Sequence, residues 1–318
     1  MPTPAKRHLR IATRQSQLAQ VQARSVGDML QRKHPGLTYE LLFVTTTGDK
    51  FMGNLAKVGG KEAFVKEIEE ALLDGRADLA VHSMKDVPTV LPDGLAIAAV
   101  MQRDDFRDVA ICRPGEEFSA LPKGAKIGTS SVRRGALLQA AFPHLTIVPV
   151  RGNVQTRLEK LKQGTVDALI LAKAGLDRLS LAERISVVFE PDMLCPALAQ
   201  GAVGVECRLD DAELNALLAA VEDKETRLCV NTERLFLKLL GGSCHTPIAG
   251  YVQVTQGGNL RLIGLVASLD GQTVLRTRHK MPAEEWQELA RLAADDVLAQ
   301  GAGAIIKEAA LATLAADY

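Results

Sequence analysis

The chain has 318 residues, which is too long for one hydrophobic core and predicts two or three domains. Its hydrophobic content of 47% is typical of a globular protein and excludes a disordered or fibrous design. Lysine plus arginine and aspartate plus glutamate both number 38, so no overall charge draws the chain to nucleic acid or to a membrane surface.

Cysteine usage and the N-terminal sequence indicate a cytoplasmic protein. The five cysteines are an odd number without a Cys-x-x-Cys pair, which argues against a disulfide framework and against a zinc ribbon. No apolar stretch reaches the length of a membrane span, and residues 1–14 lack the apolar segment of a signal peptide. We therefore expect a cytoplasmic chain with no membrane partner, no nucleic-acid partner and no metal site.

The first predicted strands are followed by polar residues. A strand at 9–13 leads to Arg14 and Ser16 and then to an amphipathic helix. A second strand at 39–45 is apolar enough to be internal in a sheet. The segment 48–61 contains four glycines without periodicity, which predicts a mobile loop of the kind that often forms a lid.

The third strand, at 79–81, is the centre of this segment and follows a predicted helix at 62–73. It is fully apolar, as expected for a strand buried on both faces of a parallel sheet, and it ends in HSMKDVP. The carboxyl ends of such strands face the ligand crevice in open α/β sheets, so Ser83, Lys85 and Asp86 are candidates for function. The alternative is a turn whose charged residues are simply solvated.

A strand at 95–101 and a charged crossing at 102–108 lead to a second α/β segment, with strands at 126–131, 146–150 and 167–172. The residues that follow these strands include Thr129, Ser130, Ser131, Arg133, Arg134, Arg151, Gly152, Asn153, Arg157 and Arg178. Helix N-termini favour anions, and three successive strand ends that each present arginine are hard to explain as a solvated surface. The segment therefore predicts an anion-binding site.

A strand at 200–206, beginning at Gln200, is expected to return to the first sheet, which makes the first domain discontinuous. Helices at 211–221 and 224–240 then lead to Cys244 on a glycine-rich loop. Alternating strands with hairpin turns, followed by an amphipathic helix at 282–299, predict a small α+β domain. The predicted domains are 1–101 with 200–220 (α/β), 106–195 (α/β) and 224–318 (α+β).

Arginine binds carboxylates through a planar fork and stays charged at physiological pH. Several arginines in one cleft therefore imply a substrate with several carboxylates. A thiolate is a strong nucleophile, but a lone cysteine is more often an inert buried residue, and Cys112, Cys195, Cys207 and Cys229 keep that interpretation. A dyad of a thiol with His82 or His245 is an alternative for which no orienting third residue is visible.

Six motifs resemble the porphobilinogen deaminase (hydroxymethylbilane synthase) family: LAKVGGK, VHSMKDVP, GTSSVRR, VRGNVQTRL, AQGAVGVECR and GGSCHTPIAGY. They span nearly the whole chain. The chain departs from the family at the cysteine loop, where it reads LLGGSCHTP and many members read closer to LEGGCQVP. The resemblance implies an α/β fold with two doubly wound domains like those of periplasmic binding proteins, plus a small α+β C-terminal domain.

The resemblance also implies the chemistry. The family condenses four porphobilinogen molecules head to tail into the linear tetrapyrrole hydroxymethylbilane, with loss of ammonia, on a dipyrromethane primer attached to a cysteine. By resemblance that cysteine is Cys244, and Asp86 is the catalytic carboxylate, suited to stabilise the methylene cation and to shuttle protons. The resemblance further implies that primer or substrate is bound by Arg14, Ser16, Lys57, Lys61, Phe64, Ser83, Lys85, Thr129, Ser130, Ser131, Arg133, Arg134, Arg151, Gly152, Asn153, Arg157, Arg178 and Gln200.

For Phe64 and Lys57, core packing and a solvated loop remain open as alternatives. Two other functions also remain open for the whole chain. A solute-binding module would hold an anion through arginines without chemistry, and a thiol acyltransferase would use a free Cys244 that reacts with alkylating agents. We expect a monomer that passes its product to the next enzyme of the pathway.

Overall fold

The computed structural model describes residues 7–50, 62–242 and 246–315. By the contacts among its residues the chain divides into two compact units. Unit 1 comprises residues 1–104 and 202–227, and unit 2 comprises residues 105–201 and 228–317. The division into three domains at the predicted boundaries stays a prediction. Among the described residues, every helix is too short or too polar to span a lipid bilayer.

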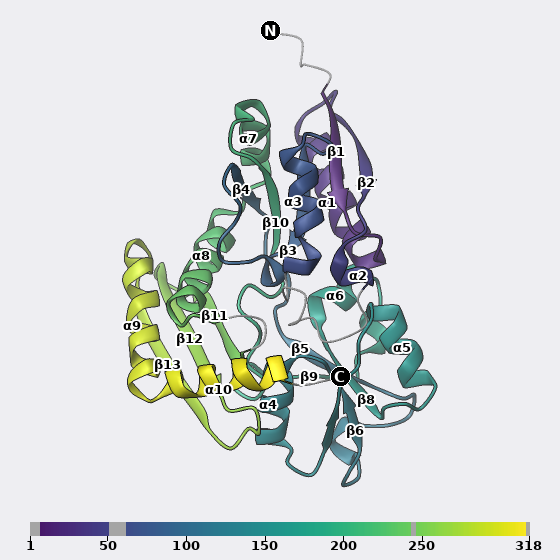
Figure 1. Ribbon diagram of the computed structural model, residues 1–318, viewed down its shortest axis with the longest axis vertical. Helices are drawn as coiled ribbons and strands as arrows, with labels where there is room; N and C mark the ends of the chain where they lie inside the picture. The colour runs from purple at the N-terminus through teal and green to yellow at the C-terminus, as the bar shows by residue number, and fades with distance from the viewer. Residues whose placement is uncertain (1–6, 51–61, 243–245, 316–318) are drawn as a thin grey trace. The chain divides into compact units, whose positions relative to one another are not determined.

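Unit 1 is built on a five-stranded sheet with the order β2-β1-β3-β10-β4 (Figure 1). Its strands are β1 (His8–Thr13), β2 (Thr38–Phe43), β3 (Leu79–Ser83), β4 (Leu95–Val100) and β10 (Val203–Arg208). β1 pairs in parallel with β2 and β3, whereas β10 runs antiparallel to β3 and β4. The predicted return of the chain to the first sheet is therefore confirmed.

Helices cover both faces of this sheet, as in a doubly wound fold. The helices of unit 1 are α1 (Gln17–Lys33), α2 (Thr47–Lys50), α3 (Lys66–Leu73) and α7 (Ala212–Leu218), with 3-10 turns at Glu62–Phe64, Met84–Asp86 and Ala219–Val221. One core contains Val26 and Leu30 of α1 together with alternate strand residues such as Leu79. The opposite core contains Ile68 and Leu72 of α3. The alternation of side chains along each strand supplies both faces.

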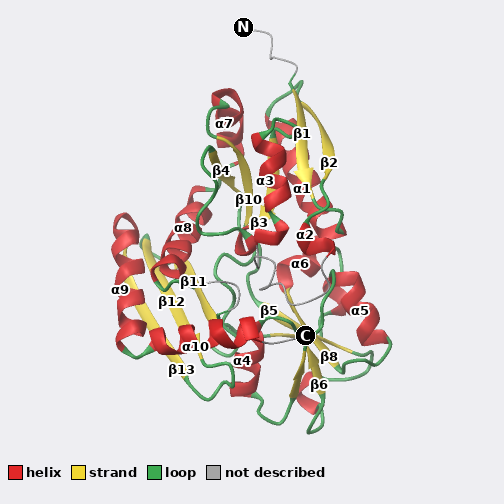
Figure 2. Ribbon diagram, in the orientation of Figure 1, coloured by secondary structure: helices red, strands yellow, loops and turns green. Residues whose placement is uncertain are grey.

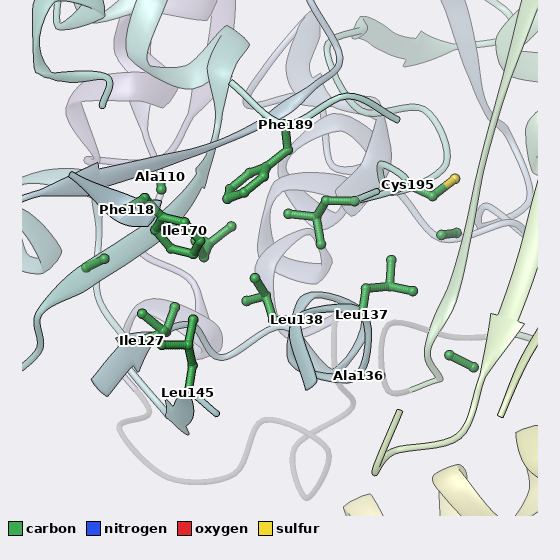
Figure 3. Close-up of a cluster of buried hydrophobic side chains, with 14 of the residues drawn as sticks. Ala110, Phe118, Ile127, Ala136, Leu137, Leu138, Leu145, Ile170, Phe189 and Cys195 are labelled. Atoms are coloured by element: carbon green, nitrogen blue, oxygen red, sulfur yellow. The ribbon is translucent and has the colours of Figure 1, made fainter. Parts of the chain in front are cut away.

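Unit 2 contains a second five-stranded sheet, with the order β7-β6-β8-β5-β9. Its strands are β5 (Asp108–Cys112), β6 (Lys126–Gly128), β7 (Thr146–Val148), β8 (Ala168–Ala172) and β9 (Val187–Val188). Its helices are α4 (Val132–Ala141), α5 (Val154–Lys162) and α6 (Lys173–Arg178), with 3-10 turns at Phe118–Ala120 and Ala182–Arg184. Figure 3 shows one core of this unit, in which Leu137 and Leu138 of α4 pack with Ile127, Ile170 and neighbouring apolar residues.

The rest of unit 2 is an antiparallel sheet with the order β11-β12-β13, covered by helices (Figure 2). Its elements are β11 (Ile248–Val254), β12 (Asn259–Ala267), β13 (Val274–Pro282), a 3-10 turn at Ala283–Glu285, α9 (Trp286–Ala299) and α10 (Ala302–Ala315). Helix α8 (Lys224–Leu239) precedes this sheet and contributes Cys229 and Phe236 to its core. Tyr251 of β11 and Leu265 of β12 also join the core of Figure 3, so this sheet packs against α4.

The predicted fold class, an α/β chain with two doubly wound sheets and a small C-terminal α+β part, is confirmed. Three details of the prediction were wrong. β2 lies at the edge of its sheet, with Thr38, Glu40 and Phe43 exposed, instead of inside it. Residues 48–50 belong to α2 instead of a loop, and the expected mobile segment from residue 51 to 61 lies outside the described residues. Asp108 opens β5 and is fully buried, whereas the sequence placed it in a charged crossing.

Candidate active site

The strand register of unit 2 brings most of the predicted residues to one edge of its sheet. β6 runs parallel to β7 and β8, so the turns that follow these three strands lie at the same edge. β5 runs antiparallel to β8, and Asp108 pairs with Ala172 at the carboxyl end of β8. The amino end of β5 therefore lies at the same edge and places a carboxylate there.

Asp108 holds the predicted arginine pair. Arg133 Nη1 donates to Asp108 Oδ2 at 2.7 Å, and Arg134 donates to Asp108 Oδ1 through Nη2 at 2.7 Å and Nε at 3.2 Å. Burial alone raises the pKa of the Asp108 carboxyl, but the charges and hydrogen bonds of the two guanidinium groups outweigh it and lower that pKa below its ordinary value. The Asp108 carboxylate is therefore ionised, and its single negative charge is paired with the positive charges of Arg133 and Arg134.

The two arginines are buried, with exposed fractions of 4% for Arg133 and 6% for Arg134, and further hydrogen bonds fix them. Arg133 Nη1 donates to the carbonyl of Cys195 at 2.6 Å, and Arg134 Nη1 donates to the carbonyl of Ile170 at 3.1 Å. Arg133 Nε is buried and has no hydrogen-bond partner among the described residues. A buried donor without a partner is unfavourable, so this group is suited to an added acceptor.

The hydroxyl residues after β6 shape the start of α4. Ser131 is the N-cap residue, and its side chain accepts a hydrogen bond from the backbone N–H of Arg134 at 3.4 Å. The buried Thr129 accepts from the backbone N–H of Ser131 at 3.2 Å, whereas Ser130 is exposed. Two of the three predicted hydroxyl groups therefore build the turn, and Ser130 faces solvent.

The turn between β7 and α5 carries three of the predicted residues, and Arg157 lies one turn into α5. Gly152 has φ +112°, and a Cβ there would lie 2.7 Å from the Thr156 side chain, so the turn requires glycine. Asn153 caps α5 by accepting from the backbone N–H of Thr156 at 2.9 Å. Arg157 Nε donates to the carbonyl of Gly152 at 2.8 Å, and Arg151 is half-buried in the same turn. The hydrogen bond from Arg157 therefore ties its guanidinium to the turn that contains Arg151.

Arg178 and Gln200 belong to the same unit. Arg178 is the last residue of α6, and its Nη2 donates to the carbonyl of Gly201 at 2.6 Å. Gln200 is 1% exposed, and its side-chain amide donates to Asp108 Oδ1 at 2.8 Å and to the carbonyl of Phe106 at 2.7 Å. The segment that carries Gln200 is therefore tied to both the arginine pair and Arg178.

In unit 1, β1, β2 and β3 are parallel, so their carboxyl ends lie at one edge as well. Arg14 follows β1 and forms an ion pair with Asp49 of α2, and its guanidinium lies 4.3 Å from the centroid of the Phe64 ring. Burial raises the pKa of the Asp49 carboxyl, but the hydrogen bonds and charge of Arg14, together with the hydrogen bonds from Thr46, outweigh it and lower the pKa. Ser16 caps α1 by accepting from the backbone N–H of Ala19 at 3.4 Å.

The end of β3 forms a 3-10 turn, Met84–Asp86, which brings Lys85 and Asp86 to a half-buried position. Ser83 accepts a hydrogen bond from Gln22 Nε2 at 2.9 Å, and the backbone N–H of Met84 donates to the carbonyl of Ala202 at 3.0 Å. These two contacts fix the start of the turn. The catalytic role of Asp86 stays a prediction.

His82 lies one residue before the turn. Its Nε2 is 2.8 Å from Glu206 Oε2, and both side chains are buried in unit 1. Its described partner is therefore a carboxylate instead of a thiol.

The four cysteines interpreted as inert are buried, namely Cys112, Cys195, Cys207 and Cys229. Burial raises the pKa of Cys195 to about 12 and that of Cys207 to about 11, so neither thiol is poised as a nucleophile. Cys244, His245, Lys57 and Lys61 lie outside the described residues.

Sequence reasoning missed the residues that position the predicted ones, namely Asp108, Asp49 and Gln22. For Asp108 the sequence contained a signal of burial, because this acidic residue directly precedes the fully apolar run VAIC, which is typical of a buried strand. The partners of Arg14 and Ser83 are more than thirty residues away in sequence, and no local pattern connects them.

Two family models match the chain. Residues 9–216 match the model described as "Porphobilinogen deaminase, dipyromethane cofactor binding domain". Residues 227–299 match the model described as "Porphobilinogen deaminase, C-terminal domain". Together they cover most of the sequence.

Curated relatives named porphobilinogen deaminase align with nearly all of the chain. The protein from Chromobacterium violaceum is 50% identical over 297 residues, which are 93% of this chain and 96% of the relative. The protein from Bordetella bronchiseptica is 46% identical over 305 residues, which are 96% of this chain and 97% of the relative. The protein from Syntrophotalea carbinolica is 46% identical over 299 residues, which are 94% and 95% of the two chains.

Solved structures that align with part of the chain include binding proteins. The methionine-binding protein MetQ has a TM-score of 0.45 at 14% identity, covering 69% of this chain and 92% of that one. A periplasmic substrate-binding protein from Coxiella burnetii has a TM-score of 0.44 at 15% identity, covering 69% of this chain and 94% of that one.

Proposed function

The chain belongs to the porphobilinogen deaminase family, and we propose that the strand-end residues described in each unit bind its cofactor and substrate. It is a transferase of tetrapyrrole biosynthesis, and it polymerises four porphobilinogen molecules head to tail into hydroxymethylbilane with release of ammonia. Its cofactor is dipyrromethane. When bound, this cofactor supplies the chain end to which each new pyrrole is added.

The observation that carries the assignment of residues is the clustering of arginine and hydroxyl side chains at one edge of the unit 2 sheet. Each pyrrole of the cofactor and of the substrate carries an acetate and a propionate group, so this donor set suits both. The buried Arg133 Nε, which has no described partner, is a donor that such a carboxylate satisfies. In this proposal Arg133, Arg134, Arg151, Arg157 and Arg178 bind carboxylates and neutralise the charge that accumulates.

Asp86 has the central role in the proposal. As porphobilinogen loses ammonia, positive charge develops on its methylene group, and a fixed carboxylate nearby stabilises that charge. The same carboxylate accepts the proton released when two pyrroles join. The contacts of Ser83 and Met84 hold the 3-10 turn that presents Asp86. Lys85, which directly precedes Asp86, adds a positive charge that suits substrate carboxylates.

Within unit 1, the proposal also assigns ligand binding to Arg14 and Phe64. Their contact at 4.3 Å places a cation and an aromatic ring together after β1. A guanidinium group suits a substrate carboxylate, and an aromatic face suits a pyrrole ring. Ser16, Lys57 and Lys61 complete the proposed set.

We also propose that Cys244 carries the cofactor and that the chain acts as a cytoplasmic monomer whose product passes to the next enzyme. Light scattering of the purified protein tests the oligomeric state. A dimer that persists at nanomolar concentration would contradict the monomer.

Intact-mass spectrometry tests the attachment site and separates this function from the two alternatives. Denatured protein should be heavier than its sequence by two linked pyrroles, and Cys244→Ala should lose both the excess mass and the consumption of porphobilinogen. Cys112→Ala removes a buried thiol and serves as the control, which should keep the excess mass. An unmodified mass in active protein would overturn the attachment site, and an inactive protein that only binds an anion would favour a solute-binding module.

A further inference from the structure

Asp108 accepts hydrogen bonds from three side chains of unit 2. Its Oδ2 accepts from Arg133 at 2.7 Å, and its Oδ1 accepts from Arg134 at 2.7 Å and from Gln200 at 2.8 Å. The carboxylate has no exposed surface. Both of its oxygens are therefore used, and the direction in which each guanidinium fork points depends on one buried anion.

The backbone that delivers Gln200 to Asp108 is strained. Ala199, the residue before it, has φ +60°, a left-handed conformation that residues with a Cβ rarely adopt. Such a conformation persists only where surrounding contacts over-determine it. Gln200 itself is 1% exposed, so its side chain has little freedom once this backbone is set.

The contact that holds Ala199 comes from Glu233 on α8. The backbone N–H of Ala199 donates to Glu233 Oε2, and the backbone N–H of Val252 donates to Glu233 Oε1 at 2.7 Å. Glu233 is fully buried, with an exposed fraction of 0%. A carboxylate inside a core is expensive unless it is well paired, so its use as an acceptor for two backbone amides indicates a specific role.

We propose that Asp108 and Glu233 are positioning residues for the arginine pair. Glu233 fixes the left-handed backbone at Ala199, that backbone places the Gln200 amide on Asp108, and Asp108 orients Arg133 and Arg134. The inference rests on the proposed function only in assigning carboxylate binding to the two arginines. Neither carboxylate touches substrate in this scheme, and both act through the residues they hold.

The test begins with Glu233→Gln, in which the amide group keeps one acceptor oxygen for the two backbone donors. We expect the KM for porphobilinogen to rise about tenfold or the cofactor content to fall by a similar factor, as for loss of one charge-assisted hydrogen bond. The value of kcat in cofactor-loaded protein should change by less than about threefold, because Asp86 is untouched. An unchanged KM together with unchanged cofactor content would overturn the role of Glu233.

A second substitution separates positioning from simple packing. Glycine adopts φ +60° without penalty, so Ala199→Gly in the Glu233→Gln background should recover at least half of the lost KM or cofactor content. A purely structural role of Glu233 predicts no such recovery, and that result would overturn the proposal. The rescue also keeps the test decisive where Asp108→Asn, the direct variant, fails to fold.

Asp108→Asn should cost more than Glu233→Gln because its amide group would face a guanidinium donor. Asp167→Asn is the matched control, since Asp167 accepts from Arg113 at 2.7 Å and from the Lys126 backbone at 2.7 Å in the same unit. Asp167 lies at the amino end of β8, away from the arginine pair, and its variant should keep wild-type KM. Equal loss in both variants would reduce Asp108 to a stabilising residue. A wild-type chain without cofactor mass or porphobilinogen consumption would instead refute the proposed function.

Discussion

Replacing Gly271 by alanine tests how closely the C-terminal sheet packs on α4, the helix that carries the arginine pair. Gly271 lies in the turn between β12 and β13 and has φ +71°. A Cβ at this position would lie 2.5 Å from the carbonyl oxygen of Ala136 and 2.7 Å from the backbone nitrogen of Ala140. Both atoms belong to the backbone of α4, so no side chain can move aside.

Gly258 provides a matched control in the turn between β11 and β12. Its φ is +79°, and a Cβ there would meet no atom within 4 Å. Gly258→Ala therefore carries only the cost of a left-handed alanine, about 1–2 kcal/mol. Gly271→Ala adds the cost of pushing the turn away from the helix, about 1–3 kcal/mol as for overpacking in a core, so the total loss should reach about 2–5 kcal/mol.

Urea unfolding monitored by fluorescence suits this comparison because Trp286 is the single tryptophan and opens α9 of unit 2. In both variants the free energy of unfolding should fall with urea concentration at the wild-type slope. The urea concentration at the midpoint of unfolding should be lowered more by Gly271→Ala than by Gly258→Ala. Because the strain also acts on α4, Gly271→Ala should also lower the cofactor content, and Gly258→Ala should not. Losses that agree within about 0.5 kcal/mol would refute the packing argument.

Three further predictions concern single side chains. Asp86→Asn should fold normally and lose roughly 10²-fold in turnover, with Asp86→Glu retaining more, and a single-turnover rate of the Asn variant within about threefold of wild type would reduce Asp86 to a turn residue. Arg151→Leu should weaken cofactor or substrate binding by about 1.5–3 kcal/mol, and Arg151→Lys should rescue it only in part because lysine lacks the planar fork; normal KM and cofactor content in the Leu variant would mark Arg151 as a surface residue. Burial raises the pKa of Asp78, but hydrogen bonds from Arg10 outweigh it and lower the pKa, so the stability gained is present above the unfolded pKa of about 4 and is lost as pH falls through the lower folded value. Asp78→Asn should accordingly lower the thermal midpoint more at pH 7 than at a pH below about 4, and an equal effect at both would contradict the ion pair as its cause.

Most of the fold could be predicted because its strands are short apolar runs that end in turn residues. Residues 79–81 are buried on both faces in the centre of their sheet, as a continuous apolar run indicates. The edge position of β2 could not be read in this way. Leu41 and Leu42 each pack against a different core, although only one side of β2 has a partner strand. Apolarity reports the burial of faces, whereas edge position depends on which strands pair.

The site could be predicted only as a set of residue types at strand ends. α4 begins after Ser131, as its capping pattern and the change of periodicity indicate, so Arg133 and Arg134 fall in its first turn. The sequence analysis predicted only that these arginines bind carboxylates of the cofactor or substrate, and it named no partner for them within the protein. Their carboxylate, Asp108, is 25 residues from Arg133 in sequence and comes from an antiparallel neighbour that no local pattern identifies.

An arginine that already holds a carboxylate is not thereby removed from ligand binding. A guanidinium group has five N–H donors, and one carboxylate oxygen accepts only part of them. Asp49 takes Nε and Nη2 of Arg14, and Asp108 takes Nη1 of Arg133 while its Nε has no described partner. A fork anchored in this way has less rotamer freedom to lose on binding than one on the surface. Paired carboxylates in both units therefore prepare arginines for a polyanionic substrate, whereas the sequence alone gives only the number of positive charges.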